Sequence, residues 1–149
     1  VARLRQRSQK IDQLYKKVAR PNVVNPIFLT EHPISLSPLA RANDDNPEIT
    51  DRFQLVINGA EIINAYSELV DPQEQERRLE VQAALKDNGD EEAMPMDHDY
   101  ISAMEVGMPP ISGWGMGIDR VVQLLTNSDN IKDVILFPLM RPLNEEKKD

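Results

Sequence analysis

Asn58-Gly59 separates two apolar runs, residues 53–57 and 60–69, and this arrangement constrains the fold more than any other feature of the chain. Asn-Gly readily adopts the left-handed backbone angles of a two-residue turn, and such a turn pairs the flanking segments as antiparallel strands. The sequence therefore predicts a β-hairpin near the middle of the chain.

Two helices are expected directly after this hairpin. The Asp71–Glu74 segment supplies an N-cap residue, a proline at the first helical position and a glutamate at the capping-box position of a polar helix that extends to about Lys86. Asp97 is the expected N-cap of a second helix, and Gly107 is its expected end. Other expected elements are a first helix broken at Pro21, a strand at 27–30, a helix from 118 to about 127 and a last buried strand at 134–137.

Length and composition exclude several classes of protein. The length of 149 residues corresponds to about one domain. The chain has no cysteine, which excludes a disulfide framework and a thiolate metal site and fits a reducing, cytoplasmic compartment. No apolar run approaches the roughly 18 residues that a membrane-spanning helix needs.

The net charge of -8 is unevenly distributed. Residues 1–20 contain seven basic side chains and one acidic side chain, so they carry +6 and the remainder carries -14. Their apolar residues have near-helical spacing, which predicts a basic amphipathic helix whose charged side is either solvated or in contact with RNA. The acidic remainder is unsuited to non-specific nucleic-acid binding.

Gly113, Gly115 and Gly117 occupy every second position before Arg120 and an apolar helix. Alternate residues of a strand share a face, so these glycines would remove the side chains from one face and let a flat ligand lie against the backbone. Arg120 would lie in the first helical turn, where its planar cationic group and the helix dipole both favour phosphate. The alternative is a glycine-rich strand packed closely against another element, with Arg120 in a surface salt bridge.

The hairpin also predicts which side chains share a face. A two-residue turn places Val56 opposite Glu61 and, with strict alternation, Gln54 opposite Ile63. Gln54 and Glu61 then project to the same side, within reach of a common ligand.

Strict alternation would place Asn64, Tyr66 and Glu68 on the opposite face. A β-bulge between Glu61 and Asn64 would bring all these groups to one face. The apolar neighbours of Glu61 and Glu68 indicate burial, and buried carboxylates require a cation. The alternative is an ordinary sheet with polar groups on a solvated face.

Two of these segments together resemble the class II lysyl-tRNA synthetases. Residues 113–120 are similar to the third signature motif of class II synthetases, and residues 58–72 are similar to the lysine-pocket strand of the family. Residues 37–41, 90–94 and 131–138 also match. The resemblance, together with the hairpin, implies an α/β (α+β) fold, in which an antiparallel sheet is flanked by helices.

The resemblance implies a role for three residues in lysine binding. Glu68 would pair with the ε-ammonium group of the substrate, and Asn64 would hold the region of its carboxylate. Tyr66 would contact lysine or its adenylate, at a position where the family often has phenylalanine. A carboxylate at position 68 suits a cationic substrate.

The resemblance also implies an ATP site. Glu61 would bind Mg²⁺ and ATP, Arg120 would bind the γ-phosphate, and Gly113, Gly115 and Gly117 would give adenine and ribose close access to the backbone. Arg120 is thus the expected catalytic residue.

Gln54 departs from the family pattern, because many members have a carboxylate there that shares the metal with the equivalent of Glu61. An amide oxygen is an uncharged and weaker ligand. Gln54 therefore either contributes to the metal site, directly or through water, or has been recruited to hydrogen-bond a neighbour.

The implied parent activity is that of a lysine–tRNA ligase of protein biosynthesis. Such an enzyme uses ATP and Mg²⁺ to activate lysine to lysyl-adenylate and transfers lysine to tRNA(Lys), as a cytoplasmic homodimer without a membrane segment. The chain lacks the family's anticodon-reading OB-fold and its first and second motifs. We therefore expect residues 1–149 to be the C-terminal portion of the catalytic domain, with a basic helix at 1–20, a core at 21–149 and motif 3 at 113–125.

A portion of this kind, truncated or proteolytic, is expected to have at most trace activation activity by itself, because half of the ATP clamp is missing. Two alternatives remain open from the sequence. One is a natural truncated paralogue that binds lysine, ATP or a synthetase subunit without catalysis. The other is a synthetase-like enzyme that lysylates a protein or small carrier.

Overall fold

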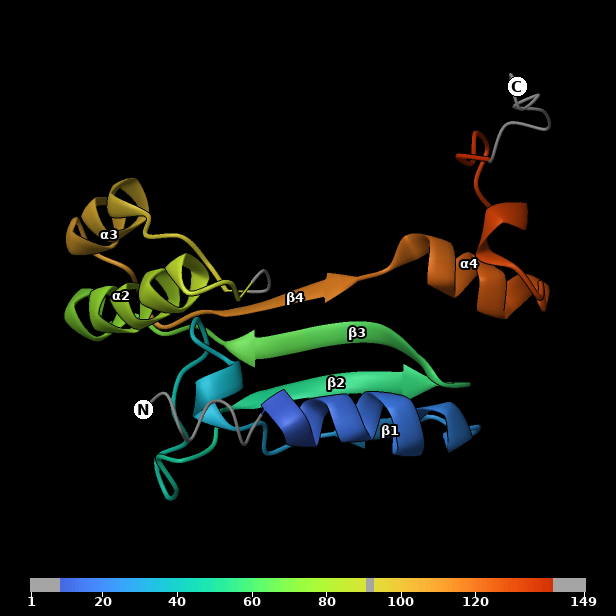
Figure 1. Cartoon of the computed structure of the whole chain (residues 1–149), viewed down its shortest axis with the longest axis horizontal. Coiled ribbons are helices and arrows are strands. Elements are labelled where there is room, and N and C mark those ends of the chain that lie inside the picture. Colours follow the sequence, from blue (N-terminus) through green and yellow to red (C-terminus); the bar gives the residue numbers. More distant parts are fainter. Residues whose placement is uncertain (1–8, 91–92, 141–149) are drawn as a thin grey trace, which may run out of the picture. The chain divides into compact units, whose positions relative to one another are not determined.

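The computed structural model describes residues 9–90 and 93–140 (Figure 1). Residues 1–8, and with them the start of the expected basic helix, lie outside the described residues, as do 91–92 and 141–149. The chain divides into two compact units, an N-terminal unit that ends at Gly115 and a C-terminal unit that begins at Met116.

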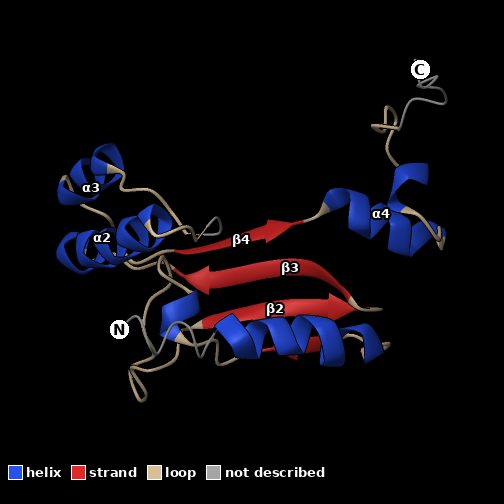
Figure 2. Ribbon diagram, in the orientation of Figure 1, coloured by secondary structure: helices blue, strands red, loops and turns tan. Residues whose placement is uncertain are grey.

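The N-terminal unit is built on a four-stranded antiparallel sheet, drawn in red in Figure 2. Its strands lie in the order β1 (Ile27–Leu29), β2 (Arg52–Ile57), β3 (Ala60–Ser67) and β4 (Ser112–Met116). Asn58 and Gly59 join β2 to β3 with φ angles of 48° and 71°, the left-handed values that a two-residue hairpin turn requires. The expected hairpin and the expected fold class are thus confirmed.

The helices of the N-terminal unit flank this sheet. Residues 9–14 are α-helical, and the helix continues as a π-helical turn, η1 (Tyr15–Ala19), and a 3₁₀ turn, η2 (Arg20–Asn22), so it ends around Pro21 as expected. A further 3₁₀ turn, η3 (Ile34–Leu36), follows β1. The helices α2 (Pro72–Asp87) and α3 (His98–Glu105) pack together at one end of the sheet (Figure 1).

A compact apolar cluster joins α2 to α3. Leu79 from α2 and Ile101 and Met104 from α3 are almost fully buried. The expected second helix is confirmed, because Asp97 accepts a hydrogen bond from the Tyr100 backbone N–H at 2.9 Å and caps α3. Partly buried side chains complete the cluster: Leu39, Met94, Met96, Tyr100 and Met108.

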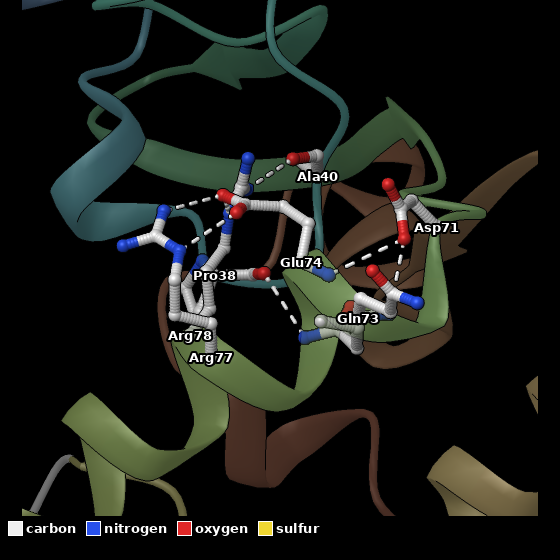
Figure 3. Close-up of polar contacts among 8 residues, drawn as sticks. Pro38, Ala40, Asp71, Gln73, Glu74, Arg77 and Arg78 are labelled. Carbon is white, nitrogen blue, oxygen red and sulfur yellow. Dashed lines mark hydrogen bonds and ion pairs between the residues drawn. The ribbon is translucent and has the colours of Figure 1, made fainter.

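The start of α2 is held by polar contacts (Figure 3). The Asp71 carboxylate accepts hydrogen bonds from the backbone N–H groups of Gln73 and Glu74, at 3.0 and 3.3 Å, as expected of an N-cap residue. Glu74 pairs with Arg77 and Arg78 in the following turn, at 2.7 Å each. Arg78 also donates to the Ala40 carbonyl oxygen at 2.8 Å, which ties α2 to the segment before β2.

The hydrogen bonds of Glu74 make the stability of the protein depend on pH in the acid range. The hydrogen bonds from Arg77, with those from Arg78, lower the pKa of Glu74 from 4.5 to about 2. A carboxyl group with a depressed folded-state pKa stabilises the protein above pH 4.5, and this stabilisation is lost as the pH falls from 4.5 through 2. Glu74→Gln should therefore lower the free energy of unfolding at pH 7 by about 1 kcal/mol, a value reduced by solvent screening.

Urea unfolding of both proteins at pH 7 and near pH 2 measures this effect. The difference between the proteins should shrink at the lower pH. Glu80→Gln, an exposed change on the same helix, serves as the control and should change stability by less than about 0.5 kcal/mol. A Glu74→Gln effect of equal size at both pH values would contradict the assignment.

The C-terminal unit contains α4 (Ile118–Thr126) and a 3₁₀ turn, η4 (Ile131–Asp133). The expected helix from 118 to about 127 is confirmed, and Asn127 ends it in a left-handed conformation with φ 51°. The expected buried strand at 134–137 is wrong, since Leu136 and Phe137 are 91% and 92% exposed. A short apolar run forms a β-strand only where a neighbouring strand can pair with it. Among the described residues, no strand pairs with residues 134–137.

None of the helices in the described ranges is both long and apolar enough to cross a membrane.

Candidate functional site

A β-bulge in the hairpin determines which polar groups share a face. Val56 lies opposite Glu61 as expected, but Gln54 lies opposite Asn64 and not opposite Ile63. The register therefore shifts by one residue between Glu61 and Asn64, where the sequence required a bulge if its polar groups were to share one face. The pairing of Gln54 with Ile63, expected from strict alternation, is wrong.

The bulge gathers polar side chains on one face of β2 and β3. Cross-strand partners share a face, so Gln54 and Asn64 project to the same side as Arg52 and its partner Tyr66. Part of this face borders an open cavity of about 940 Å³ within the N-terminal unit. Its lining includes His32, Arg52, Gln54 and Glu61, together with Asp12 and Lys16 of the first helix. Asn64, Tyr66 and Glu68 are not among the lining residues.

Gln54 links Glu61 to a histidine that the sequence analysis did not identify. The Gln54 Nε2 atom lies 2.6 Å from Glu61 Oε2, and the Gln54 Oε1 atom lies 3.2 Å from His32 Nε2. Burial, followed by the positive charge of Arg52, lowers the pKa of His32. Within the described ranges, no three His, Asp or Glu side chains are grouped to hold a metal ion.

Arg52 is a second site residue that the sequence analysis missed. Its Nε atom donates to Asn64 Oδ1 at 2.9 Å, and its Nη1 atom donates to Ser37 Oγ at 2.9 Å and to the Leu36 carbonyl oxygen at 3.3 Å. Since the Asn64 oxygen accepts from Arg52, the orientation of that side chain is defined and its amide nitrogen remains the donor. Arg52 is two residues before Gln54 in the same strand, and alternate residues of a strand share a face. This spacing is the sequence signal that could have identified it.

Glu68 lies directly after β3 and beside β4. Its backbone N–H donates to the Ile111 carbonyl oxygen at 3.0 Å. Burial raises the pKa of Glu68, and burial together with the Glu68 charge raises the pKa of both Tyr66 and Tyr100. No Lys, Arg or His in residues 9–90 or 93–140 forms a salt bridge with Glu68. The structure thus presents a partly buried carboxylate next to two tyrosines.

The glycines of the expected nucleotide site differ in their surroundings. A Cβ atom added to Gly113 would lie 2.5 Å from Glu68 Oε1, whereas one added to Gly115 would meet nothing within 4 Å. Gly113 therefore makes room for a carboxylate, and Gly115 leaves the backbone open. Both lie in the N-terminal unit.

Gly117 and Arg120 lie in the C-terminal unit, at the start of α4. Gly117 is the N-cap residue, and Arg120 is in the first helical turn, as expected. A Cβ atom on Gly117 would lie 3.3 Å from Arg120 Cδ, so the arginine side chain packs along the glycine backbone. The exposed side chain of Arg120 lies close to the positive end of the helix dipole, a position that favours phosphate.

Comparison with known proteins assigns the family. A family model described as tRNA synthetases class II (D, K and N) matches residues 5–141. The chain belongs to this family. The expected membership of the class II synthetases is therefore confirmed.

Curated members of this family include similar lysine–tRNA ligases. That of Cronobacter sakazakii is 53% identical over 133 residues, which are 89% of this chain and 26% of that protein. The enzyme of Hahella chejuensis is 54% identical over 131 residues, which are 88% of this chain and 26% of that protein. The enzyme of Escherichia coli is 53% identical over 133 residues, which are 89% of this chain and 26% of that protein. This class II synthetase chain thus spans about a quarter of the length of the curated relatives it matches.

Proposed function

We propose that the chain is the C-terminal portion, residues 1–149, of the catalytic domain of a lysine–tRNA ligase. The parent enzyme would use ATP to activate lysine to lysyl-adenylate and transfer lysine to tRNA(Lys), as a homodimer in the cytoplasm. The identity to lysine–tRNA ligases supports this proposal. The single structural observation that carries it is Glu68, a partly buried carboxylate without a basic partner among the described side chains.

Three residues would bind lysine. Glu68 would pair with the ε-ammonium group, since a partly buried carboxylate gains most from a cation. Asn64 would donate its amide N–H groups to the substrate carboxylate, because Arg52 already occupies its oxygen. Tyr66, whose partner across the sheet is Arg52, would contact the lysine side chain or its adenylate.

The same proposal assigns the ATP contacts. Arg120 would neutralise charge on the γ-phosphate, and the open backbone of Gly115 would admit the flat adenine and ribose, with Gly113 and Gly117 beside it in sequence. Glu61 supplies a carboxylate oxygen of the kind that Mg²⁺ prefers. Gln54 directs its amide nitrogen, not its oxygen, toward Glu61, so we do not propose it as a metal ligand.

Activation involves little acid–base chemistry, and these residues would act by position and charge. Glu61 would hold Mg²⁺ bound with ATP, and the metal would supply positive charge to the phosphate groups. The lysine carboxylate would attack the α-phosphate, form lysyl-adenylate and displace pyrophosphate. Glu68 and Asn64 would hold the two ends of lysine and so fix the direction of that carboxylate.

ATP–pyrophosphate exchange by the intact protein, as its gene encodes it, tests the proposal. Exchange that requires lysine, followed by charging of tRNA(Lys), is the expected result. Binding of lysine or ATP without exchange would instead indicate a non-catalytic paralogue. Exchange followed by lysine transfer to a protein or small carrier, and not to tRNA, would indicate a carrier-lysylating enzyme.

The variant Gln54→Glu tests whether position 54 belongs to the metal site. The variant would lose the hydrogen bond to Glu61 and place two carboxylates in contact, which raises the pKa of one of them. We therefore expect an unchanged or higher magnesium requirement when exchange activity is titrated with Mg²⁺. Gln13→Glu, which adds the same charge to the lining of the same cavity, is the matched control. A lower requirement for Gln54→Glu alone would mean that position 54 is a metal position.

A further inference from the structure

His32 contacts the polar face of the sheet from a different part of the chain. It follows β1, and its side chain reaches Gln54 of β2, 22 residues further along. Its backbone is held independently, because the His32 carbonyl oxygen accepts hydrogen bonds from the Thr50 backbone N–H at 2.9 Å and from the Thr50 hydroxyl at 3.1 Å. A change in the His32 side chain therefore leaves this anchor intact.

The hydrogen-bonding rules of the three side chains determine how Gln54 is oriented. An ionised Glu61 carboxylate only accepts hydrogen bonds, so the Gln54 atom 2.6 Å away must be the amide nitrogen. The amide oxygen then points to His32, whose Nε2 atom must carry a proton to donate across 3.2 Å. The opposite amide orientation would place two acceptor oxygens in contact at Glu61.

We propose that His32 is a positioning residue that fixes the Gln54 amide so that it donates to Glu61. His32 donates through Nε2 in the required neutral tautomer, and it also donates through Nε2 when both ring nitrogens are protonated. Gln54 thereby orients Glu61 without adding a second negative charge. Without the His32 donor, the amide oxygen loses its partner, and the Gln54 side chain is held only by its hydrogen bond to Glu61, so that it orients Glu61 less rigidly.

The kinetic consequence rests on the proposed function, in which Glu61 binds ATP and its magnesium. Loss of the His32 donor should disturb Glu61 and leave Glu68 unaffected. His32→Phe should therefore raise the KM for ATP by about 3- to 10-fold, the range expected for one side-chain hydrogen bond. The KM for lysine should change by less than about twofold. His32→Gln, which retains an N–H donor, should restore the KM for ATP to within about twofold of the parent.

A double-mutant cycle separates positioning from simple packing. His32→Phe is made in the parent and in Gln54→Met, which has no amide to orient. In the Gln54→Met background, His32→Phe should have no further effect on the KM for ATP or on Tm. Equal effects in both backgrounds, or a normal KM for ATP in His32→Phe beside an impaired Gln54→Met, would overturn the proposal.

The ring tautomer provides a test that does not depend on activity or on the variants folding. ¹⁵N NMR of the intact protein labelled on histidine should show a proton on Nε2 of His32, and a cross-peak from it to the Gln54 side chain. This chain has two histidines, and the other, His98, is exposed. A neutral His32 protonated on Nδ1 would refute the proposal. A third outcome is also distinguishable: the protein shows the expected tautomer and non-additive changes in Tm, but no lysine-dependent exchange. That result would refute the proposed function and leave the role of His32 intact.

Discussion

Glu68→Gln is expected to raise the KM for lysine by at least about 30-fold while the KM for ATP changes by less than about twofold. The substitution keeps the shape of the side chain and removes the charge that would pair with the substrate ammonium. Removing one partner of a desolvated charge pair costs about 2 to 5 kcal/mol, and the lower end applies to a partly buried group. The measurement is ATP–pyrophosphate exchange by the intact protein, with the concentrations of lysine and ATP varied separately.

Glu61→Gln is the matched control, because it makes the same chemical change in β3, the strand that ends just before Glu68. It should act on ATP and on the magnesium requirement, and not on lysine. An unchanged KM for lysine in Glu68→Gln would show that Glu68 does not bind the ammonium group.

Gly113→Ala is expected to weaken lysine binding by about 10-fold or more without a large loss of stability. The added Cβ atom would lie 2.5 Å from Glu68 Oε1, so the carboxylate must move. The atom that moves is the end of a flexible side chain, and we therefore expect Tm to fall by only a few degrees, as for about 1 kcal/mol. The KM for lysine and thermal unfolding, measured on the same preparations, test both parts.

Gly115→Ala provides the control for Gly113→Ala, since its Cβ atom would meet nothing within 4 Å. It should leave the KM for lysine unchanged. In a Glu68→Gln background, Gly113→Ala should have little further effect on lysine binding, because the charge it displaces is already absent. Additive losses would mean that Gly113 acts on lysine by a route other than Glu68.

Much of the local structure followed from short sequence signals. The Asn58-Gly59 turn, the Asp71 and Asp97 caps and the position of Arg120 in α4 were all predicted, because each depends on residues within a few positions of one another. The resemblance to class II lysyl-tRNA synthetases, carried by two motifs, led to the correct family. The assigned roles of the site residues remain predictions.

The failures arose where the outcome depended on residues far apart in sequence. The apolar run at 134–137 matched the pattern of a buried strand, but strand formation needs a partner that periodicity does not reveal. One departure was local: Glu74 was identified at the capping-box position, yet its carboxylate pairs with Arg77 and Arg78, three and four residues further along the same helix.

The sequence by itself determined the hairpin, the helix boundaries and most of the polar residues along β2 and β3, since turn angles, caps and alternation are local properties of the backbone. The tertiary structure decided the bulge that places Gln54 opposite Asn64, and the contacts of His32 with Gln54 and of Arg52 with Ser37. A bulge and a contact between distant segments depend on how whole strands fit against each other. No short window of sequence contains that information.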